Sequence, residues 1–449
     1  MVHGKLFLAM IKNISQNALE IIKKLHQKGH QAYLVGGCLR DSLLGLPVKE
    51  WDITTSAKPD EVTKLFPKVI PTGIDYGTVT ILLKDGQYEV TTFRSDEKYV
   101  DGRHPSNVKF TDDIHQDLSR RDFTVNALAY DPATKKLIDD FEGQKDLKKK
   151  LIRAIGNPVD RLSEDGLRAV RACRFAARLG FEIEPKTFAA IAQTLDVTKK
   201  VAPERIHDEL VKMLCAANPS VGFALMQKCG LLKLILPELE DCYGVEQPPT
   251  FHKYDVFWHS LHACDAAAEA LPQRLAALFH DIGKPSCKEG YTFYNHDKVG
   301  AEMAGRILKR LRFSSEIINK VKNLIEHHMF NYTSAWTDAA VRRFIRRIGG
   351  AKNVSGLFAL RIADATAMER EVEQEYLNEL QKRIDKIIAE QNALHVADLK
   401  VDGKDVMKIL GVPAGPKVGQ VLNCLLEKVL DDPDLNEHKT LEKMIKNNE

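Results

Sequence analysis

Three acidic side chains in the first hundred residues have the spacing of a metal site for phosphoryl chemistry. Glu50 and Asp52 stand two positions apart in the β-like run 51–55, where a period of two directs both carboxylates to one face. Glu89 lies in a second alternating run, residues 88–93, and supplies a third carboxylate. Such carboxylates can hold two Mg²⁺ ions about 3.5–4 Å apart, which neutralise a triphosphate and activate an attacking hydroxyl. The favoured chemistry is transfer of a nucleotidyl group, although Glu-x-Asp is also typical of a solvated strand edge.

A pair of glycines upstream fits an anion-binding turn. Gly36 and Gly37 lie between a short apolar run, residues 32–35, and a helical pattern over residues 39–44. A glycine turn from a strand into a helix directs bare backbone N–H groups at an anion. We therefore expect the pair to hold phosphate beside the carboxylates; a tight turn without a ligand is the alternative.

Three more segments follow the glycines and the carboxylates in order. They are Arg120-Arg121-Asp122-Phe123-Thr124-Val125-Asn126-Ala127, Glu164-Asp165-Gly166-Leu167-Arg168 and Glu204-Arg205-Ile206. With the glycine motif, this order resembles the signature of class II tRNA nucleotidyltransferases, the CCA-adding enzymes, and of the related bacterial poly(A) polymerases. The resemblance covers about residues 30–250.

The resemblance implies a role for each matching position. Glu50 and Asp52 would hold the catalytic metals, and Asp165 with Arg168 would read the base of the incoming nucleotide. The other nucleotide-binding positions implied are Gly36, Gly37, Arg40, Arg120, Arg121, Asp122, Asn126, Arg171 and Arg174. The family usually has Asp-x-Asp where this chain has Glu50-Trp51-Asp52. The extra methylene of Glu50 moves its carboxylate by about one C–C bond, which alters the metal geometry there.

Base recognition by Asp165 and Arg168 also has a chemical basis. They are three apart in the helical pattern 163–179, so both side chains emerge on one face. A carboxylate accepts from the exocyclic amine of cytosine or adenine, whereas uracil and guanine present a carbonyl oxygen there. That mismatch would leave a buried charge unpaired at a cost of at least ~1–3 kcal/mol. Protein side chains could thus select CTP and ATP without a nucleic-acid template; an ordinary helix ion pair is the alternative.

A second concentration of metal-ligating residue types lies in the C-terminal half. Seven of the fifteen histidines fall between His252 and His328. Imidazoles together with carboxylates suit a divalent metal that activates water for phosphate-ester cleavage. The candidate ligands are His259, His280, Asp281, His296, His327, His328 and Asp364.

This second group resembles the HD superfamily of metal-dependent phosphohydrolases. The resemblance implies a divalent metal of unspecified identity on His259, His280, Asp281 and Asp364, and a second metal on His296 with either His327 or His328. His262, three residues after His259, is a competing ligand. Some nucleotidyltransferases that resemble this chain carry an HD domain with phosphatase and 2′,3′-cyclic phosphodiesterase activity. An HD fold whose histidines are satisfied in the core is the alternative.

Composition is typical of a soluble globular protein of three or four domains, with 449 residues, 44% apolar and 28% charged. The expected class is α+β, with a small N-terminal α/β nucleotidyltransferase head like that of polymerase β, followed by an all-α neck, HD region and tail. The expected parts are an N-terminal helix (1–30), the catalytic head (31–155), a neck and body for nucleotide selection and RNA binding (156–250), an HD metal-binding domain (251–370) and a tRNA-binding tail (371–449).

Location and redox state follow from the same composition. No apolar run approaches the ~20 residues of a membrane span, and no cleavage site follows residues 1–10, so we expect a cytoplasmic protein without a membrane partner. The eight cysteines form no Cys-x-x-Cys pair, which indicates reduced, mostly buried thiols.

Net charge is only +3, so any RNA contact must come from local patches. Two basic groups near the proposed active site face either RNA or solvent, namely Lys145, Lys148, Lys149, Lys150 and Arg153, and then Arg168, Arg171, Arg174 and Arg178. A third group is expected to be a solvated face, and consists of Arg342, Arg343, Arg346 and Arg347. In the tail, glycines and prolines over 411–419 precede a helical pattern, 418–430, whose start suits RNA backbone or simply a helical hairpin.

The sequence therefore predicts template-independent addition and repair of the 3′-terminal CCA of tRNA, from CTP and ATP with Mg²⁺. The polar stretch 94–118, with 101–105 at its centre, is expected to be the loop that switches the resembled enzymes from C to A addition. The alternatives are a poly(A) polymerase, an enzyme that adds only CC or A, an HD phosphohydrolase with an RNA-binding head, and a nucleotide-sensing module.

Overall fold

The computed structural model describes residues 11, 13–96, 108–249, 253–370, 374–390 and 392–447. The chain divides into two compact units, Met1–Glu240 (unit 1) and Asp241–Glu449 (unit 2). The centre of the predicted switching loop, 101–105, lies outside the described residues, as does His252. No helix in the described ranges has both the length and the apolar character that crossing a membrane requires. The cytoplasmic location stays a prediction.

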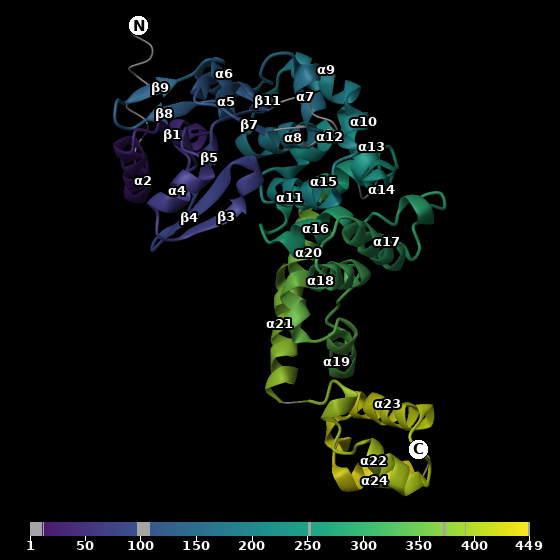
Figure 1. The fold of residues 1–449 in the computed structure, drawn as a ribbon. Coiled ribbons are helices and arrows are strands. Elements are labelled where there is room, and N and C mark those ends of the chain that lie inside the picture. Colours follow the sequence, from purple (N-terminus) through teal and green to yellow (C-terminus); the bar gives the residue numbers. More distant parts are fainter. Residues whose placement is uncertain are drawn as a thin grey trace. The chain divides into compact units, whose positions relative to one another are not determined.

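A mixed sheet of seven strands forms the centre of unit 1, in the order β3-β4-β5-β2-β1-β8-β9 (Figure 1). The pair β2–β5 is parallel and the other neighbours are antiparallel. The strands of this sheet are β1 (Ala32–Val35), β2 (Ile53–Thr55), β3 (Val69–Gly73), β4 (Thr78–Leu83), β5 (Gly86–Thr92), β8 (Ala129–Asp131) and β9 (Lys136–Ile138). Two small ribbons pair β6 (Arg94–Asp96) with β7 (Val108–Phe110), and β10 (Leu151–Ile152) with β11 (Glu182–Ile183).

Alternating burial explains which strands the sequence predicts. Along β5, Tyr88, Val90 and Thr92 are buried while Glu89 between them is exposed. The apolar runs 32–35 and 78–83 predict strands, and both predictions are confirmed. β3 has mostly exposed residues and β9 is only three residues long, so neither gives a periodic signal.

The apolar run over residues 125–130 also predicts a strand, and this prediction is wrong in its first half. The short 3₁₀ helix η2 (Thr124–Asn126) occupies it, and strand β8 begins only at Ala129. The reason is local hydrogen bonding, because the backbone N–H of Asn126 donates to the carbonyl of Phe123 and its side chain donates to Asp122. Such local bonds compete with the ladder of a sheet.

Helices pack against inner strands of the sheet, among them β1, β2 and β4, and form the rest of unit 1. Proline at the first helical position starts several of them, as its fixed φ favours. The helices are α2 (Gln16–Gln27), α3 (Gly37–Leu43), α4 (Pro59–Leu65), α5 (Ile114–Ser119), α6 (Gly143–Lys149), α7 (Pro158–Glu164), α8 (Leu167–Leu179), α9 (Pro185–Gln193), α10 (Leu195–Thr198), α11 (Pro203–Leu214), α12 (Pro219–Lys228), α13 (Leu231–Ile235) and α14 (Pro237–Glu240), with the 3₁₀ turn η1 (Ile74–Tyr76).

The predicted helix 163–179 is in fact two helices, α7 and α8, separated at Asp165. Asp165 is extended, with φ −143° and ψ 109°. Gly166 then passes so close to Thr198 that an added Cβ would lie 2.6 Å from its backbone nitrogen. Residues 163–166 include no apolar side chain, so the apolar pattern does not mark where α7 ends and α8 begins.

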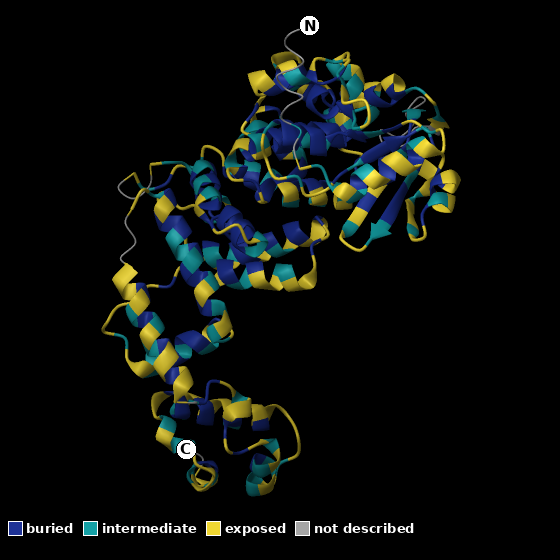
Figure 2. Cartoon of the chain, turned by 90° about the vertical axis from the view of Figure 1, so that its left-hand side faces the viewer, coloured by how far each residue is buried: buried dark blue, intermediate teal, exposed yellow. Residues whose placement is uncertain are grey.

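Unit 2 is helical throughout its described part, apart from one isolated bridge between Glu289 and Thr292. Buried Leu377, Leu380 and Ile384 on α21 have helical spacing, and Figure 2 shows such helices with buried and exposed sides. The helices are α15 (Val256–Ala266), α16 (Leu271–Phe279), α17 (His296–Arg310), α18 (Ser315–His327), α19 (Asp338–Arg347), α20 (Val354–Ala367), α21 (Gln374–Ala389), α22 (Gly403–Leu410), α23 (Pro416–Asp431) and α24 (His438–Lys446), with 3₁₀ turns η3 (Pro285–Cys287), η4 (Ala351–Asn353), η5 (Val396–Asp398) and η6 (Pro433–Leu435).

Three of the four arginines of α19 correct one expectation, because they dock α19 onto α23, while Arg347 is exposed as expected. Arg342 is buried and donates to the carbonyls of Leu430 (2.7 Å) and Asp431 (3.2 Å). Arg343 and Arg346 both pair with Glu427. Helical spacing alone cannot distinguish arginines that face water from arginines that face another helix.

Candidate functional site

The glycine pair forms a turn from β1 into α3, as expected. Gly36 has φ 77°, a conformation that residues with a side chain rarely adopt, and α3 begins at Gly37. The N–H groups of the first turn of a helix have no partner within that helix. Arg121 lies over the turn, since an added Cβ on Gly36 would lie 3.1 Å from its Nη1. The Nε of Arg121 is buried and has no hydrogen-bond partner among the described residues, so amides and a cation converge here.

Two of the predicted carboxylates are neighbours because of the parallel pairing of β2 with β5. Ile53 is in register with Val90, and Asp52 and Glu89 are the residues directly before them. Burial, repulsion from Glu89 and repulsion from Glu50 raise the pKa of Asp52 to about 6, although Arg121 opposes the shift. Crowding of negative charge of this kind is relieved by a divalent cation, so the donor set fits a metal with oxygen ligands.

Glu50 does not belong to an alternating strand as expected, because β2 begins at Ile53 and not at Trp51. Glu50 instead lies in the segment that leads into the strand, and its side chain is exposed. Its electrostatic effect on Asp52 still places the two carboxylates near each other. The longer side chain of Glu50 is therefore attached to a non-strand backbone position.

Asp117 anchors the two arginines of the third motif, and the sequence analysis did not single it out. It is fully buried, and its Oδ1 accepts from the Nε (2.9 Å) and Nη2 (2.7 Å) of Arg120. Its Oδ2 accepts from the Nη2 of Arg121 at 3.2 Å. Arg120 is thereby held in place by two bonds, while Arg121 keeps its Nη1 beside the glycine turn.

Asp122 and Asn126 connect the third motif to the glycine turn. The Oδ1 of buried Asp122 accepts from the backbone N–H of Phe123 (2.8 Å) and from the side chain of Asn126 (3.0 Å). Arg40, which is 3% exposed, donates to Asn126 (2.7 Å) and to Asp41 (2.7 Å). The resemblance implied a triphosphate contact for Arg40. In this structure its guanidinium is instead occupied inside the protein and braces the turn.

Asp165 does not pair with Arg168, so the helix ion pair considered as an alternative is wrong. Its Oδ1 accepts from the backbone N–H of Leu167 (3.0 Å), and its carboxylate pairs with Arg205 at 3.1 and 2.7 Å. A carboxylate offers about four lone-pair sites, so these three bonds leave room for one more donor. The break between α7 and α8 is what frees Asp165 for this arrangement.

Arg168 is buried on the first turn of α8 and binds the protein itself. It pairs with Glu164 and donates to the carbonyls of Arg161 (2.8 Å) and Arg120 (2.8 Å). A guanidinium has five N–H groups, and these bonds use three of them. Arg168 thus retains donors while the protein fixes its orientation.

Arg171 and Arg174 continue the row on α8 and share buried Glu209 of α11. Arg171 also donates to the Oδ2 of Asp122 at 2.8 Å. Burial alone would raise the pKa of Asp122, but Arg171 and Asn126 hold it well below its ordinary value. The predicted basic stripe is therefore neutralised by carboxylates, and it links the head to the helices that follow it.

Two further members of the basic groups follow the same rule, whereas Lys148, Lys149 and Lys150 are exposed. Arg178 pairs with Asp41 at 2.8 Å, and Arg153 pairs with Asp146 at 2.8 Å. Sequence reasoning gave no role to the acidic partners Asp117, Asp41, Asp146 and Glu209, or to Arg205 as the partner of Asp165. Only Arg205 had a signal, since it lies within the motif Glu204-Arg205-Ile206.

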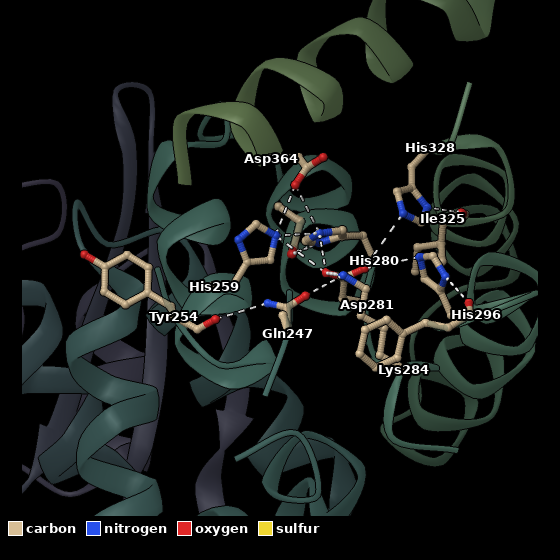
Figure 3. Close-up of polar contacts among 12 residues, drawn as sticks. Gln247, Tyr254, His259, His280, Asp281, Lys284, His296, Ile325, His328 and Asp364 are labelled. Atoms are coloured by element: carbon tan, nitrogen blue, oxygen red, sulfur yellow. Dashed lines mark hydrogen bonds and ion pairs between the residues drawn. The ribbon is translucent and has the colours of Figure 1, made fainter. Parts of the chain in front are cut away.

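In unit 2, the structure brings together two groups of three metal-ligating side chains. In each group the potential ligand atoms lie within 4.8 Å of one another, and all six residues are buried. Figure 3 shows the first group turned toward Asp281 from one side and the histidines of the second group approaching it from the other. The groups are His259, His280 and Asp364, and then Asp281, His296 and His328.

Asp281 belongs to the second group and also contacts the histidines of the first group. Its Oδ2 is 3.5 Å from the Nε2 of His259 and 3.2 Å from the Nε2 of His280. Its Oδ1 is 3.4 Å from the Nε2 of His296 and 3.9 Å from that of His328. One carboxylate thus offers an oxygen to each group, as a ligand that bridges two cations would.

The histidine tautomers suit metal ligation. The Nδ1 atoms of His280, His296 and His328 each lie 2.7–2.8 Å from a backbone carbonyl, which can only accept a hydrogen bond. Each Nδ1 therefore carries the proton, and in the neutral ring the Nε2 lone pair faces the cluster. The Nε2 of His296 is buried without a hydrogen-bond partner among the described residues, although Asp281 is 3.4 Å away. These donors fit a divalent metal.

The pKa values reflect the same crowding. Burial would lower the pKa of His280, but Asp281 and Asp364 raise it to about 10. Burial and the neighbouring His280 lower the pKa of His328 to about 4. Strong shifts in opposite directions within one cluster are typical of functional sites.

Two histidines considered as ligands belong to neither group. His327, at the end of α18, is half-buried, and its neighbour His328 occupies the cluster instead. His262 stacks against Tyr254 with ring centroids 4.5 Å apart. His327 is the last residue of α18 and His328 its C-cap, and one residue along a helix turns a side chain by about 100°, so only His328 faces the cluster here.

Comparisons with known proteins agree with this geometry. The models "Poly A polymerase head domain", "Probable RNA and SrmB- binding site of polymerase A" and "tRNA nucleotidyltransferase domain 2 putative" match residues 32–153, 180–243 and 293–445. The CCA-adding enzyme of Enterococcus faecalis is 32% identical over 437 residues, covering 97% of this chain and 96% of that protein.

Solved structures give the same result. The structure of the Bacillus stearothermophilus CCA-adding enzyme in complex with CTP has a TM-score of 0.75 at 28% identity, and the match covers 96% of this chain and 97% of that one. The Thermotoga maritima CCA-adding enzyme complexed with tRNA_CCA shares the fold, with a TM-score of 0.57 at 20% identity over 98% of each chain. The predicted fold class is thus confirmed.

Proposed function

The chain belongs to the family of CCA-adding enzymes, and on that premise we propose that it adds and repairs the 3′-terminal CCA of tRNA from CTP and ATP. The observation that carries this proposal is the parallel register of β2 with β5, which sets Asp52 beside Glu89 next to the glycine turn. In the reaction, the 3′-hydroxyl oxygen of tRNA bonds to the α-phosphorus of the nucleotide. The bond from that phosphorus to pyrophosphate breaks.

The residues of the head divide this work among them. The amides after Gly36 and the guanidinium of Arg121 bind the triphosphate, because both are directed at the same turn. Glu50, Asp52 and Glu89 hold the divalent cations, which we take to be Mg²⁺ because all three donors are hard oxygens. Bound at these carboxylates, Mg²⁺ would supply charge neutralisation and activation of the hydroxyl. Arg40 and Asn126 act indirectly, by keeping the turn in shape.

Base selection rests on Asp165 and Arg168. Asp165 has about one lone-pair site left after its bonds to Leu167 and Arg205, which suits a single exocyclic amine. Arg168 has donors left for a ring acceptor. Arg205 orients Asp165, so we expect Arg205→Ala to weaken base discrimination without contact to the base.

The test is incubation of the purified chain with tRNA that lacks its CCA end and with each nucleoside triphosphate, singly and together. Product lengths are resolved to one nucleotide. We expect three added residues that end in A, followed by arrest. A long A tract would indicate a poly(A) polymerase, and arrest after two residues would indicate a CC-adding enzyme.

A second candidate function is metal-dependent hydrolysis of phosphate esters in unit 2. It is supported by the two groups of ligands that share Asp281 and by the proton on each Nδ1. Two divalent cations held there would supply Lewis acidity to a phosphate ester. In the hydrolysis a water oxygen bonds to phosphorus, the ester P–O bond breaks, and the leaving oxygen takes up the proton that the water releases.

The adjacent histidines give a matched test of this hydrolysis. The measurement is release of p-nitrophenol from bis(p-nitrophenyl) phosphate by the full chain with Mn²⁺, Co²⁺, Ni²⁺ or Mg²⁺. We expect His328→Ala to abolish hydrolysis and His327→Ala to retain it, while both variants still extend tRNA. Equal loss in both variants, or hydrolysis that persists in His328→Ala, would contradict the assignment.

A further inference from the structure

A pocket of about 440 Å³ opens onto the histidine cluster of unit 2. Its floor contains His280, Asp281, His296, His328 and Asp364. A second pocket, also about 440 Å³, is lined on other sides by Asn331, Tyr332, Thr333 and Tyr376. The two pockets share Arg361, Met368 and Arg370, so they lie side by side, and we call the two pockets together the groove.

The charge of the groove fits a phosphate backbone. Arg361 and Arg370 line both pockets, whereas the Nζ of Lys284 is buried and already paired with Asp281 at 2.7 Å. Arg361 is half-buried, and its ion pair with Asp364 is long, at 3.7 Å. The same two arginines thus face the pocket at the cluster and the pocket beyond it, a position that suits a phosphate between two nucleotides.

Aromatic side chains stand at both pockets with unusual exposure. Tyr294 lines the pocket at the cluster and is 75% exposed, with Met329 beside it at 57%. Tyr376, at the start of α21, lines the second pocket and is 44% exposed. Exposed aromatic rings interleaved with cations are typical of proteins that stack the bases of single-stranded nucleic acid.

We propose that this groove binds a single RNA strand of at least two nucleotides and presents one of its phosphates to the histidine cluster. Tyr294 stacks on the base at the cluster, Tyr376 stacks on the neighbouring base, and Arg361 contacts the phosphate between them. The inference rests on the proposed hydrolysis for what happens to that phosphate. It goes beyond that function in naming the substrate class as a strand, not a free nucleotide or an inorganic phosphate.

Steady-state hydrolysis separates a strand from smaller substrates. The full chain with its metal is given a 3′-phosphorylated RNA trinucleotide, the corresponding mononucleotide, or p-nitrophenyl phosphate. We expect Tyr376→Ala to raise KM for the trinucleotide roughly tenfold or more, as loss of one stacked base does, with kcat and the other two substrates unchanged. Tyr376→Phe should restore KM, because stacking needs the ring and not the hydroxyl.

Tyr291 supplies a matched control for Tyr294. It is 56% exposed, lies three residues away and lines neither pocket. Tyr294→Ala should raise KM for both the trinucleotide and the mononucleotide, whereas Tyr291→Ala should change neither. Equal effects of the two substitutions, or no effect of Tyr376→Ala on the trinucleotide, would overturn the proposal.

A measurement without metal separates this inference from the hydrolytic function. In EDTA, a trinucleotide that carries 4-thiouridine is photo-crosslinked to the full chain, and the crosslinked peptides are identified by mass spectrometry. We expect crosslinks at Tyr294 and Tyr376 that are lost in the corresponding alanine variants. Crosslinks there without hydrolysis would support the groove and refute the hydrolase. Hydrolysis of p-nitrophenyl phosphate with crosslinks confined to unit 1 would support the hydrolase and refute RNA binding in the groove.

Discussion

The two candidate sites gather acidic side chains in opposite ways. In unit 1, Glu89 lies on β5 and is exposed, whereas Asp52 directly precedes the neighbouring strand β2 and is half-buried. In unit 2, Asp281 and Asp364 are buried among histidines from separate helices. The carboxylates of unit 1 are partly open to solvent, so their repulsion has little consequence for packing. The buried ones depend on their cationic or metal neighbours, so removing a ligand should affect activity alone in unit 1 and both activity and folding in unit 2.

The largest expected effect is on nucleotidyl transfer in Asp52→Asn. Loss of a metal-binding carboxylate should lower kcat/KM for CTP addition on the order of 10³-fold. The pKa of Asp52 is raised in the fold, so its charge is unfavourable there at neutral pH. We therefore expect the free energy of unfolding to stay the same or increase slightly, as measured by urea denaturation at pH 7.

Asp60→Asn is the control for Asp52→Asn, since Asp60 is an exposed acid in the first turn of α4. It should change neither activity nor stability. If Asp52→Asn destabilised unit 1 by more than this control, the carboxylate would have a structural role, and the contrast between the two sites would fail.

The next largest expected effect is the loss of unfolding free energy when a buried ion-pair partner in unit 1 is removed. Glu209→Gln would leave Arg174 and Arg171 without the charge that they share, at a cost of about 3 kcal/mol in the free energy of unfolding. Glu427→Gln in unit 2 removes the partner of exposed Arg343, and should cost less than about 1 kcal/mol. Denaturant melts of both variants would show whether burial, and not the unit, sets the cost.

Metal should stabilise unit 2. A divalent cation that binds only the folded cluster at 100 times its Kd would add about 2.7 kcal/mol to the free energy of unfolding. We expect Mn²⁺ or Co²⁺ to raise the Tm of the unit 2 transition by several degrees over EDTA, in His327→Ala as in the unmodified chain. His328→Ala should lose most of this shift. A shift of equal size in both variants would show that the cation binds elsewhere.

The smallest expected effect is on nucleotide choice. Asp165→Ala should reduce the preference for CTP and ATP over UTP and GTP by about 1–3 kcal/mol while the triphosphate still binds. The measurement is kcat/KM for each of the four nucleotides with tRNA that lacks its CCA end. Full retention of the preference would contradict base recognition by protein side chains. Because Asp165 also caps α8, a melt should show an accompanying loss of about 1 kcal/mol.

The sequence predicted the class, the family and the position of the glycine turn, because each depends on local patterns. Strands β1 and β4 alternate or run apolar over their full lengths, and Gly36 needs a positive φ. The sequence could not predict that α7 ends before Asp165. The cause of that break is the close approach of Gly166 to Thr198, which is distant in sequence.

The sequence also did not predict which charged side chains pair with each other. Arg168 and Asp165 have the spacing of an ion pair, yet Arg205, forty residues away, competes successfully for Asp165. The choice between His327 and His328 depended on the rotation of one helix against others. Residue types predicted which groups could bind metal, and packing determined which of them meet.

The register of β2 with β5 limits which insertions and deletions this enzyme can tolerate during evolution. A slip of one residue in a strand exchanges its two faces, so it would bury Glu89 and expose Val90. A residue inserted inside β5 could therefore abolish nucleotidyl transfer even though Glu50, Asp52 and Glu89 all remain in the sequence. We expect an insertion or deletion within β5 to be as damaging as substitution of a carboxylate. A sequence comparison that checks only whether the three acidic residues are present would overlook such a change.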